Sequence, residues 1–289
     1  MSFEECRPLK GRVALVTGGS RGIGAGISRK LAAWGCTLAV NYVDRAGPAR
    51  RLAAELEELG TKVTLHQADL GETAAVARLL EEVGSVHGDL NILVQNAAAT
   101  KFIALEDATP EQWQFVQDTN ARATWLLAKH AIPLMRDRPG ARFITITNST
   151  TQRIVPRAGL FGAAKAALEN LTNYLSYELA PYGIVANCVR PGLVQTDVFN
   201  VRPDFAGGVL HEMAVTPWRD GLMTTPENSA DVVAMLCLDE ASWIAGQTIT
   251  VDGGYQLWGN LGARRDPRAG QQQQGQQGQQ EQQPGPVPS

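Results

Sequence analysis

The fold is decided by residues 12–24, which read RVALVTGGSRGIG. The first five residues are an apolar run typical of a buried parallel strand, and an amphipathic segment ending near Trp34 follows the glycines. This order predicts a strand, a glycine turn and a helix. We expect Gly18 to permit the sharp turn, Gly22 to let a pyrophosphate approach the backbone, and Gly24 to let the helix pack close to the strand. The free N–H groups at the helix start then face the phosphates.

Further apolar runs repeat this alternation of strand and helix along the chain. Right-handed crossovers between parallel strands place helices on both faces of a sheet. Together with the first strand, these runs predict an α/β fold: a single Rossmann-like, doubly wound parallel sheet of seven strands with helices on both faces. The runs are residues 38–42, 62–66, 90–94, 143–147, 184–189 and 248–251.

The composition is that of an ordinary soluble protein with one large domain. Of its 289 residues, 44% are hydrophobic and 19% charged, and the net charge of -3 offers no basic field to DNA or RNA. The cysteines are scattered without metal-ligand spacing, so we expect no metal site. The N-terminus is acidic, and no run approaches the ~20 apolar residues of a membrane helix. We therefore expect a cytoplasmic protein with no nucleic-acid or membrane partner.

Three segments stand apart from the alternation of strands and helices. Residues 1–11 precede the predicted domain, residues 12–260, as an N-terminal extension. Residues 193–225 are long, apolar and punctuated by glycine, as expected of a substrate loop that closes over a site. Residues 261–289 are rich in Gln, Gly and Pro and are unable to bury a core, so we expect a disordered tail.

The spacing Thr-Gly-x-x-x-Gly-x-Gly in residues 17–24 resembles that of the short-chain dehydrogenase/reductase family. Further landmarks of the family follow in order up to Gly254, nearly the whole folded chain. The resemblance implies an oxidoreductase that binds a nicotinamide dinucleotide. The landmarks are Asp69-Leu70, Asn96-Ala97, Asn120, Lys165, Pro191-Gly192 and the VDGG run of residues 251–254.

The residues around the expected nucleotide favour NADP(H). NAD-selective proteins usually present an acidic residue to the adenosine ribose after the second strand, where this chain has Asn41-Tyr42. Ser20 and Arg21 add a hydroxyl and a guanidinium, which suit a 2′-phosphate. In similar proteins this combination implies NADP(H).

The resemblance also assigns cofactor contacts along the rest of the chain. Asp69 resembles the family's adenine contact and Asn96 a contact on the ribose side, while Val194 and Thr196 resemble the pair that holds the nicotinamide carboxamide. The family's usual Asn-Asn-Ala-Gly run here ends in Ala98, whose methyl is expected to crowd a backbone contact. The expected cofactor-binding residues are Gly18, Ser20, Arg21, Gly22, Ile23, Gly24, Asn41, Tyr42, Asp69, Leu70, Asn96, Ala97, Lys165, Pro191, Gly192, Val194 and Thr196.

The catalytic residues of the family are Asn, Ser, Tyr and Lys. Asn120 matches the Asn, which holds a water, and Lys165 matches the Lys, which grips the nicotinamide ribose and lowers the phenol pKa by its positive charge. Family spacing puts Asn148 at the serine position. Ser149 or Thr150 takes that place if the loop is shorter.

Phe161 occupies the tyrosine position, four residues before the lysine, and carries no proton to give. A general acid contributes ~10²–10⁴-fold to ketone reduction, whereas an iminium needs no proton and a conjugated alkene can take one later from water. Family members from biosynthetic pathways include proteins with degraded catalytic sets that reduce imines. We therefore expect an NADPH-dependent reductase of an apolar small molecule: an imine, an enone, or a carbonyl with a substitute acid.

Two alternatives stay open beside the reductase. One is a non-redox isomerase or cyclase that uses the fold as a shaped pocket, and the other is a catalytically silent, NADP(H)-binding regulatory protein. The retained Lys165 and Asn120 favour the reductase. Residues 110–135 and 159–181 combine apolar stripes with many alanines, and in similar proteins these helices pair across a two-fold axis. We therefore expect a homodimer or homotetramer.

Overall fold

The computed structural model describes residues 7–194, 196 and 224–258. The predicted tail, most of the predicted substrate loop and residues 1–6 of the predicted extension lie outside the described residues. The rest of that extension joins the domain. Leu9 is fully buried, and its backbone N–H donates to the carbonyl of Trp34 (3.0 Å).

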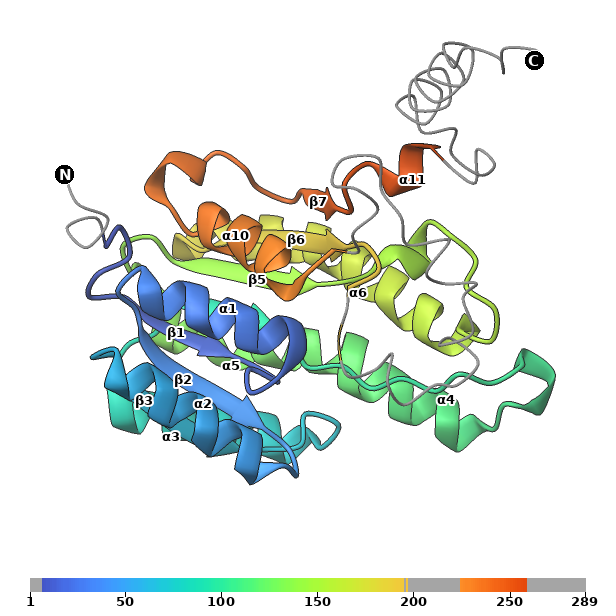
Figure 1. The fold of residues 1–289 in the computed structure, drawn as a ribbon, viewed down its shortest axis with the longest axis horizontal. Coiled ribbons are helices and arrows are strands. Elements are labelled where there is room, and N and C mark those ends of the chain that lie inside the picture. The colour runs from blue at the N-terminus through green and yellow to red at the C-terminus, as the bar shows by residue number, and fades with distance from the viewer. Residues whose placement is uncertain (1–6, 195, 197–223, 259–289) are drawn as a thin grey trace, which may run out of the picture. The chain divides into compact units, whose positions relative to one another are not determined.

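A seven-stranded, entirely parallel sheet forms the centre of the domain, in the order β3-β2-β1-β4-β5-β6-β7 (Figure 1). This confirms the predicted fold class. Parallel strands buried on both faces are near-continuous apolar runs, as β1 and β4 are at the centre of the sheet, whereas β3 and β7 at its edges are less buried. The strands are β1 (Val13–Val16), β2 (Thr37–Tyr42), β3 (Val63–Gln67), β4 (Ile92–Gln95), β5 (Arg142–Ile146), β6 (Val185–Pro191) and β7 (Thr248–Val251).

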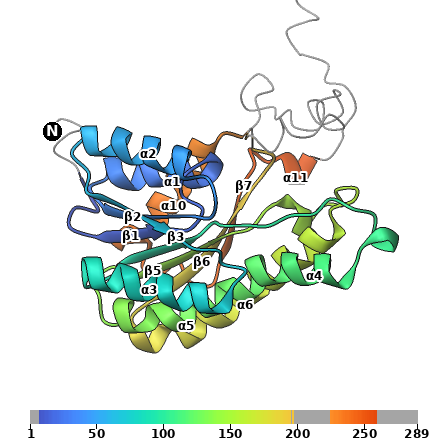
Figure 2. The ribbon, with the colours of Figure 1, turned by 90° about the horizontal axis from the view of Figure 1, so that it is seen from below.

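Helices cover both faces of the sheet (Figure 2). On one face, α1 (Gly22–Ala33), α2 (Ala46–Glu58) and α10 (Pro226–Leu236) enclose one apolar cluster. On the other, α3 (Thr73–His87), α5 (Ala123–Met135) and α6 (Gly159–Glu178) enclose a second. Shorter elements are η1 (Leu105–Asp107), α4 (Pro110–Gln117), η2 (Asp118–Arg122), η3 (Ser149–Thr151), η4 (Ala180–Tyr182), η5 (Asp239–Ala241) and α11 (Tyr255–Trp258).

The predicted long helix over residues 110–135 is divided. A π-helical turn, η2, separates α4 from α5 and carries Asn120. Such turns widen a helix by one residue and are frequent at functional sites.

Strand order reverses between β1 and β4, because β2 and β3 extend the sheet to one side and β5, β6 and β7 extend it to the other. Ligands of doubly wound sheets bind outside the carboxyl ends of the strands at such a reversal. The segments that follow β1, β4, β5 and β6 meet at this edge.

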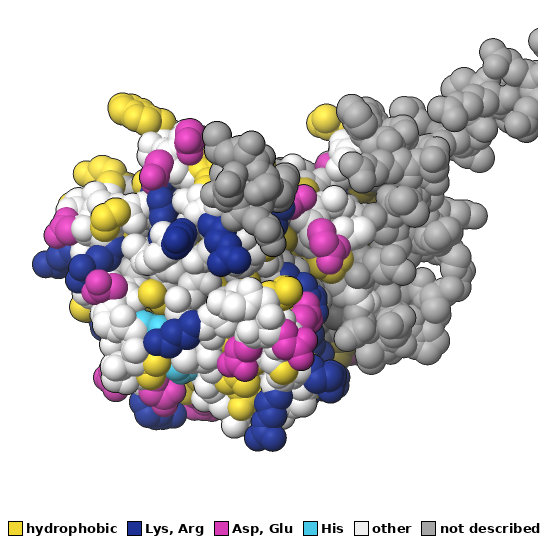
Figure 3. All heavy atoms as spheres, turned by 60° about the vertical axis from the view of Figure 1, so that its left-hand side comes forward, with side chains coloured by type: hydrophobic (Ala, Val, Ile, Leu, Met, Phe, Trp, Pro, Cys, Tyr) yellow, Lys and Arg dark blue, Asp and Glu magenta, His cyan; other side chains and the backbone are white. Residues whose placement is uncertain are grey.

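The surface has mixed charge. Basic and acidic side chains are interspersed on the face shown in Figure 3. Among the described residues, no helix is long and apolar enough to cross a membrane.

Candidate active site

The glycine turn after β1 has the backbone conformation that its sequence predicts. Gly18 (φ +57°) and Gly22 (φ +52°) lie in the left-handed region that favours glycine. A Cβ on Gly24 would lie 2.2 Å from the carbonyl oxygen of Gly18, so α1 starts this close to the turn only with glycine there. The turn is therefore a cradle that leaves backbone N–H groups accessible at the start of α1.

Asn41 holds this turn in place through hydrogen bonds of its side chain. The side chain is fully buried; its Oδ1 accepts from the N–H of Gly18 (3.2 Å), and its Nδ2 donates to the carbonyls of His66 (3.2 Å) and Ala68 (3.0 Å). This differs from the expectation that Asn41 faces a 2′-phosphate, because its amide is already used by the backbone of β3 and the turn. Its neighbour Tyr42 lines the pocket instead.

A pocket opens beside the turn. Arg21 and Arg45 bring two guanidinium groups to it, and Ser20 and Tyr42 bring hydroxyls. Arg45 was not among the predicted residues. A basic residue in the loop that leaves β2, directly after Asp44, is a local signal from which it could have been predicted. The lining residues are Gly18, Ser20, Arg21, Gly22, Ile23, Gly24, Tyr42, Val43, Asp44, Arg45, Asn96, Ala97, Ala98 and Thr196.

Asn96 connects this pocket to β4. Its Nδ2 donates to the carbonyls of Thr17 (3.0 Å) and Gly18 (3.1 Å), so the end of β4 and the turn hold each other. Asp69 lines a neighbouring pocket that shares Val43 with the first. The side chain of Leu70, by contrast, is fully buried in the core.

A second pocket, which we call the reaction pocket, continues from the first. The two pockets share Ile23 and Thr196, so they adjoin. Its walls are mostly apolar, with polar groups contributed by the end of β5 and by η3. No tyrosine lines the described part of it, and Tyr174 and Tyr177 of α6 are exposed elsewhere. The lining residues are Ile23, Phe102, Thr147, Asn148, Ser149, Thr150, Val155, Phe161, Pro191, Gly192, Leu193, Val194 and Thr196.

Lys165 lies on α6, one turn after Phe161. It is 2% exposed, its Nζ donates to the carbonyl of Ile146 (2.8 Å), and the Nζ lies 5.6 Å from the centroid of the Phe161 ring. Burial lowers the pKa of Lys165 to about 8, against opposing effects of Cys188 and Glu169. The aromatic face partly compensates the buried cation.

Asn120 is also buried and oriented by the backbone. Its Nδ2 donates to the carbonyls of Ala99 and Val116, both at 2.8 Å. Its Oδ1 is buried and has no hydrogen-bond partner among the described residues. The π-helical turn thus holds a buried acceptor, and Asn120 does not line either of the two pockets.

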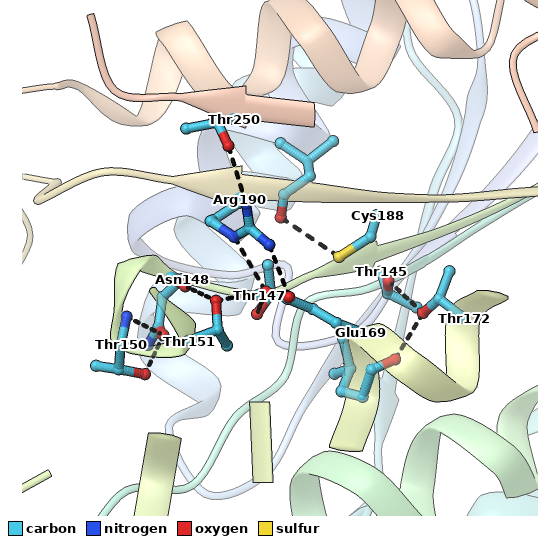
Figure 4. Close-up of polar contacts among 12 residues, drawn as sticks. Thr145, Thr147, Asn148, Thr150, Thr151, Glu169, Thr172, Cys188, Arg190 and Thr250 are labelled. Carbon is cyan, nitrogen blue, oxygen red and sulfur yellow. Dashed lines mark hydrogen bonds and ion pairs between the residues drawn. The ribbon is translucent and has the colours of Figure 1, made fainter. Parts of the chain in front are cut away.

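A buried ion pair lies behind the reaction pocket (Figure 4). Arg190 of β6 donates to Glu169 of α6 through Nε (3.1 Å) and Nη2 (2.7 Å). Glu169 Oε1 also accepts from the hydroxyls of Thr147 (2.8 Å) and Thr151 (2.7 Å). The sequence pattern left this network unpredicted; its only local signal is a glutamate one helical turn after Lys165.

The chain belongs to the short-chain dehydrogenase/reductase family. Residues 18–256 match the protein family that is described as "Enoyl-(Acyl carrier protein) reductase". The chain is 36% identical over 251 residues to 1-cyclohexenylcarbonyl-CoA reductase of Streptomyces collinus, covering 85% of this chain and 87% of that protein. It is 31% identical over 263 residues to tetrahydroxynaphthalene reductase PfmaG of Pestalotiopsis fici, covering 88% and 94%.

A solved structure gives the same result. A short-chain dehydrogenase from Burkholderia cenocepacia in complex with NADP superposes with a TM-score of 0.78 at 32% identity, over 86% of this chain and 99% of that one. Oxidoreductases of this fold are therefore the relatives of this chain in both sequence and structure.

The buried lysine makes stability depend on pH. Because the pKa of Lys165 falls from 10.5 to about 8 on folding, the unfolded chain binds more protons between these values, and the lysine's contribution to stability rises with pH there. Relative to Lys165→Met, the wild type should gain up to about 3 kcal/mol across this window. Urea unfolding at stepped pH measures it. Lys129→Met, an exposed lysine of α5, serves as the control; parallel curves for wild type and Lys165→Met would contradict the prediction.

Proposed function

We propose that this chain is an NADPH-dependent reductase of an apolar small organic molecule and that its site lacks a phenolic proton donor. The observation that carries the proposal is the position of Phe161. It lines the reaction pocket one helical turn from the buried Lys165, where a hydroxyl would be needed to protonate an alkoxide. The chain retains the other elements expected of the site, namely Asn120, Lys165 and the glycine turn.

NADP(H) fits the residues that line the nucleotide pocket. The glycine turn leaves room for a pyrophosphate, and Arg21, Arg45 and Ser20 offer two guanidinium groups and a hydroxyl to a 2′-phosphate. The Burkholderia relative supports this choice, since it was solved with NADP. When bound, the nucleotide supplies a hydride. The chain's own residues orient it: Lys165 at the nicotinamide ribose, and Val194 and Thr196 at the carboxamide.

The loss of the phenol restricts the substrate. An imine, an enone, or a carbonyl with a substitute acid remains compatible with Phe161, since a phenolic acid contributes ~10²–10⁴-fold only where a proton must arrive in the transition state. The apolar walls of the reaction pocket favour an apolar substrate of the kind made in biosynthetic pathways. The relatives' names, a cyclohexenylcarbonyl-CoA reductase and a tetrahydroxynaphthalene reductase, support cyclic, unsaturated molecules.

We also propose a homodimer or homotetramer. Large aromatic side chains on α4, α5 and α6 are exposed: Trp113 (46%), Phe115 (47%), Trp125 (49%) and Tyr174 (63%). Burying such side chains between copies of the chain would remove apolar surface from water.

Cofactor choice depends on the guanidinium groups. Arg21→Ala should weaken NADPH binding about 10- to 100-fold and leave NADH nearly unchanged, because a charge-assisted phosphate contact is worth ~1.5–3 kcal/mol. Calorimetric titration of both nucleotides measures this. Arg78→Ala, an exposed arginine of the neighbouring pocket, is the matched control. Equal losses for NADPH and NADH would show that Arg21 supports the turn rather than binding the phosphate.

The proposed reaction is tested by restoring the phenol. Phe161→Tyr should leave turnover of the preferred substrate unchanged or lower it, because an unpaired hydroxyl in an apolar wall costs ~1–3 kcal/mol. Lys165→Ala should be far more harmful, since small errors in hydride position are costly. The measurement is NADPH oxidation on matched iminium, enone and ketone substrates. If Phe161→Tyr raises ketone turnover by orders of magnitude, the chain is a damaged carbonyl reductase; conversion without NADPH consumption would remove the reductase altogether.

A further inference from the structure

The π-helical turn η2 contacts the loops that follow β3 and β4. Asn120 Nδ2 donates to the carbonyl of Ala99 (2.8 Å), in the β4 loop, which we define as residues 96–100. Arg122 Nη2 donates to the carbonyl of Gly71, in the β3 loop, which we define as residues 69–72. Residues two positions apart on a helix do not share a face, so these two side chains contact different loops. The turn therefore joins two segments at the carboxyl edge of the sheet.

The guanidinium of Arg122 is also fixed within η2. Its Nη1 lies 3.1 Å from Oδ1 of Asp118, at the start of the same element. The Asp118 carboxylate accepts from Gln114 Nε2 of α4 as well, and its side chain is only 15% exposed. A guanidinium presents its donors in a planar fork, so holding one nitrogen fixes the direction of the other. Arg122 is thus a rigid link between η2 and Gly71.

The β3 loop packs directly on η2 at Gly71. A Cβ on this glycine would lie 3.3 Å from Thr119 Oγ1 and 3.2 Å from Asp69 Oδ1, so a side chain there would push both groups. The N–H of Gly71 donates to Asp69 Oδ1 (2.8 Å). Gly71 therefore connects two groups: Arg122 fixes its carbonyl, and its N–H fixes the carboxylate of Asp69.

The second oxygen of that carboxylate is available to a ligand. Asp69 Oδ2 has no hydrogen-bond partner among the residues that the structure describes, and Asp69 lines the pocket next to the nucleotide pocket. Pyrophosphate fits the glycine turn after β1, and a 2′-phosphate fits Arg45 after β2, so the adenine of NADPH extends toward β3. The adenine amino group is a donor, and an ionised carboxylate is an acceptor.

We propose that Arg122 is a positioning residue for the nucleotide: through Gly71 it holds Asp69 Oδ2 where the adenine amino group binds. The inference rests on the proposed NADPH dependence and adds a residue that lines none of the three pockets. A loop that is ordered before binding costs less to order on binding, which raises affinity without a new contact.

The effect should fall on nucleotide affinity and not on the hydride step. The reaction pocket is lined by neither the β3 loop nor the β4 loop, so a change in the β3 loop leaves its walls in place. Arg122 would then change the KM for NADPH and leave kcat nearly unchanged, which is the signature of binding that is equal in the ground state and the transition state.

A role in fold stability alone explains Arg122 less well. A partly exposed ion pair one helical turn apart, such as that with Asp118, contributes little to stability. The Nε of Arg122 is buried and has no hydrogen-bond partner in the described part of the chain, which costs stability. Both observations favour a side chain kept for its contact with the β3 loop.

The test compares NADPH with its hypoxanthine analogue, in which an oxygen replaces the adenine amino group. Arg122→Met should weaken binding of NADPH about 10-fold and of the analogue less than about threefold, because only NADPH offers a donor to Asp69. Calorimetric titration of the full chain measures both affinities. Arg138→Met, which removes an exposed ion pair with Asp89, is the matched control and should change neither.

Gly71→Ala reaches the β3 loop by a second route. The added methyl pushes the loop away from Thr119 and leaves Arg122 unaltered. This variant should also weaken NADPH more than the analogue, and it carries the same prediction if Arg122→Met fails to fold. In NADPH oxidation, both variants should raise the KM for NADPH about 10-fold and keep kcat within about twofold.

The outcomes separate this inference from the proposed function. Equal losses for NADPH and the analogue, unchanged NADPH affinity in the folded variants, or a fall in kcat with an unchanged KM for NADPH would overturn the role of Arg122 and leave the reductase. A wild type that binds no NADPH, or that consumes none with the matched iminium, enone and ketone substrates, would overturn the proposed function as well.

Discussion

The ion pair between Arg190 and Glu169 is the interaction on which the shape of the reaction pocket depends. It joins β6 to α6 behind the pocket, and the side chains of Arg190 and Glu169 are only 8% and 15% exposed. Removing one partner of such a pair leaves an uncompensated buried charge, at a typical cost of about 3–5 kcal/mol. The hydroxyls of Thr147 and Thr151 share the same carboxylate, so the ends of β5 and η3 take their positions from it. The pocket wall is therefore rigid at its polar side.

Lys165 carries a second buried charge, and its surroundings differ from those of the ion pair. Lys165 has no carboxylate within hydrogen-bonding distance among the residues that the structure describes; its Nζ contacts a carbonyl and an aromatic face. Burial without a full partner lowers its pKa to about 8. A position so costly to keep charged is typical of functional sites rather than of packing. The ring of Phe161, which carries no hydroxyl, lies beside the ammonium.

Local signals in the sequence were enough to predict the sheet and the glycine turn. Strand runs and glycine conformations depend on neighbouring residues, and Gly18 and Gly24 behave as their spacing predicts. Roles set by distant contacts were not predictable in this way. Asn41 lies at the end of β2, where a nucleotide contact is expected, yet its amide is taken by the backbone of the turn and of β3. In the sequence, Arg190 is one more residue of a predicted strand. Its contact with Glu169 is made only by the fold.

The central claim is that hydride passes from NADPH to a substrate in the reaction pocket and that no side-chain phenol supplies the proton. The most direct measurement uses NADPH deuterated at the transferred position of C4, with 2-cyclohexenone as substrate and mass and NMR spectra of the product. The account predicts one deuterium at the β-carbon and, in a parallel reaction in D2O with ordinary NADPH, one at the α-carbon. A product formed without deuterium from the nucleotide would contradict the account.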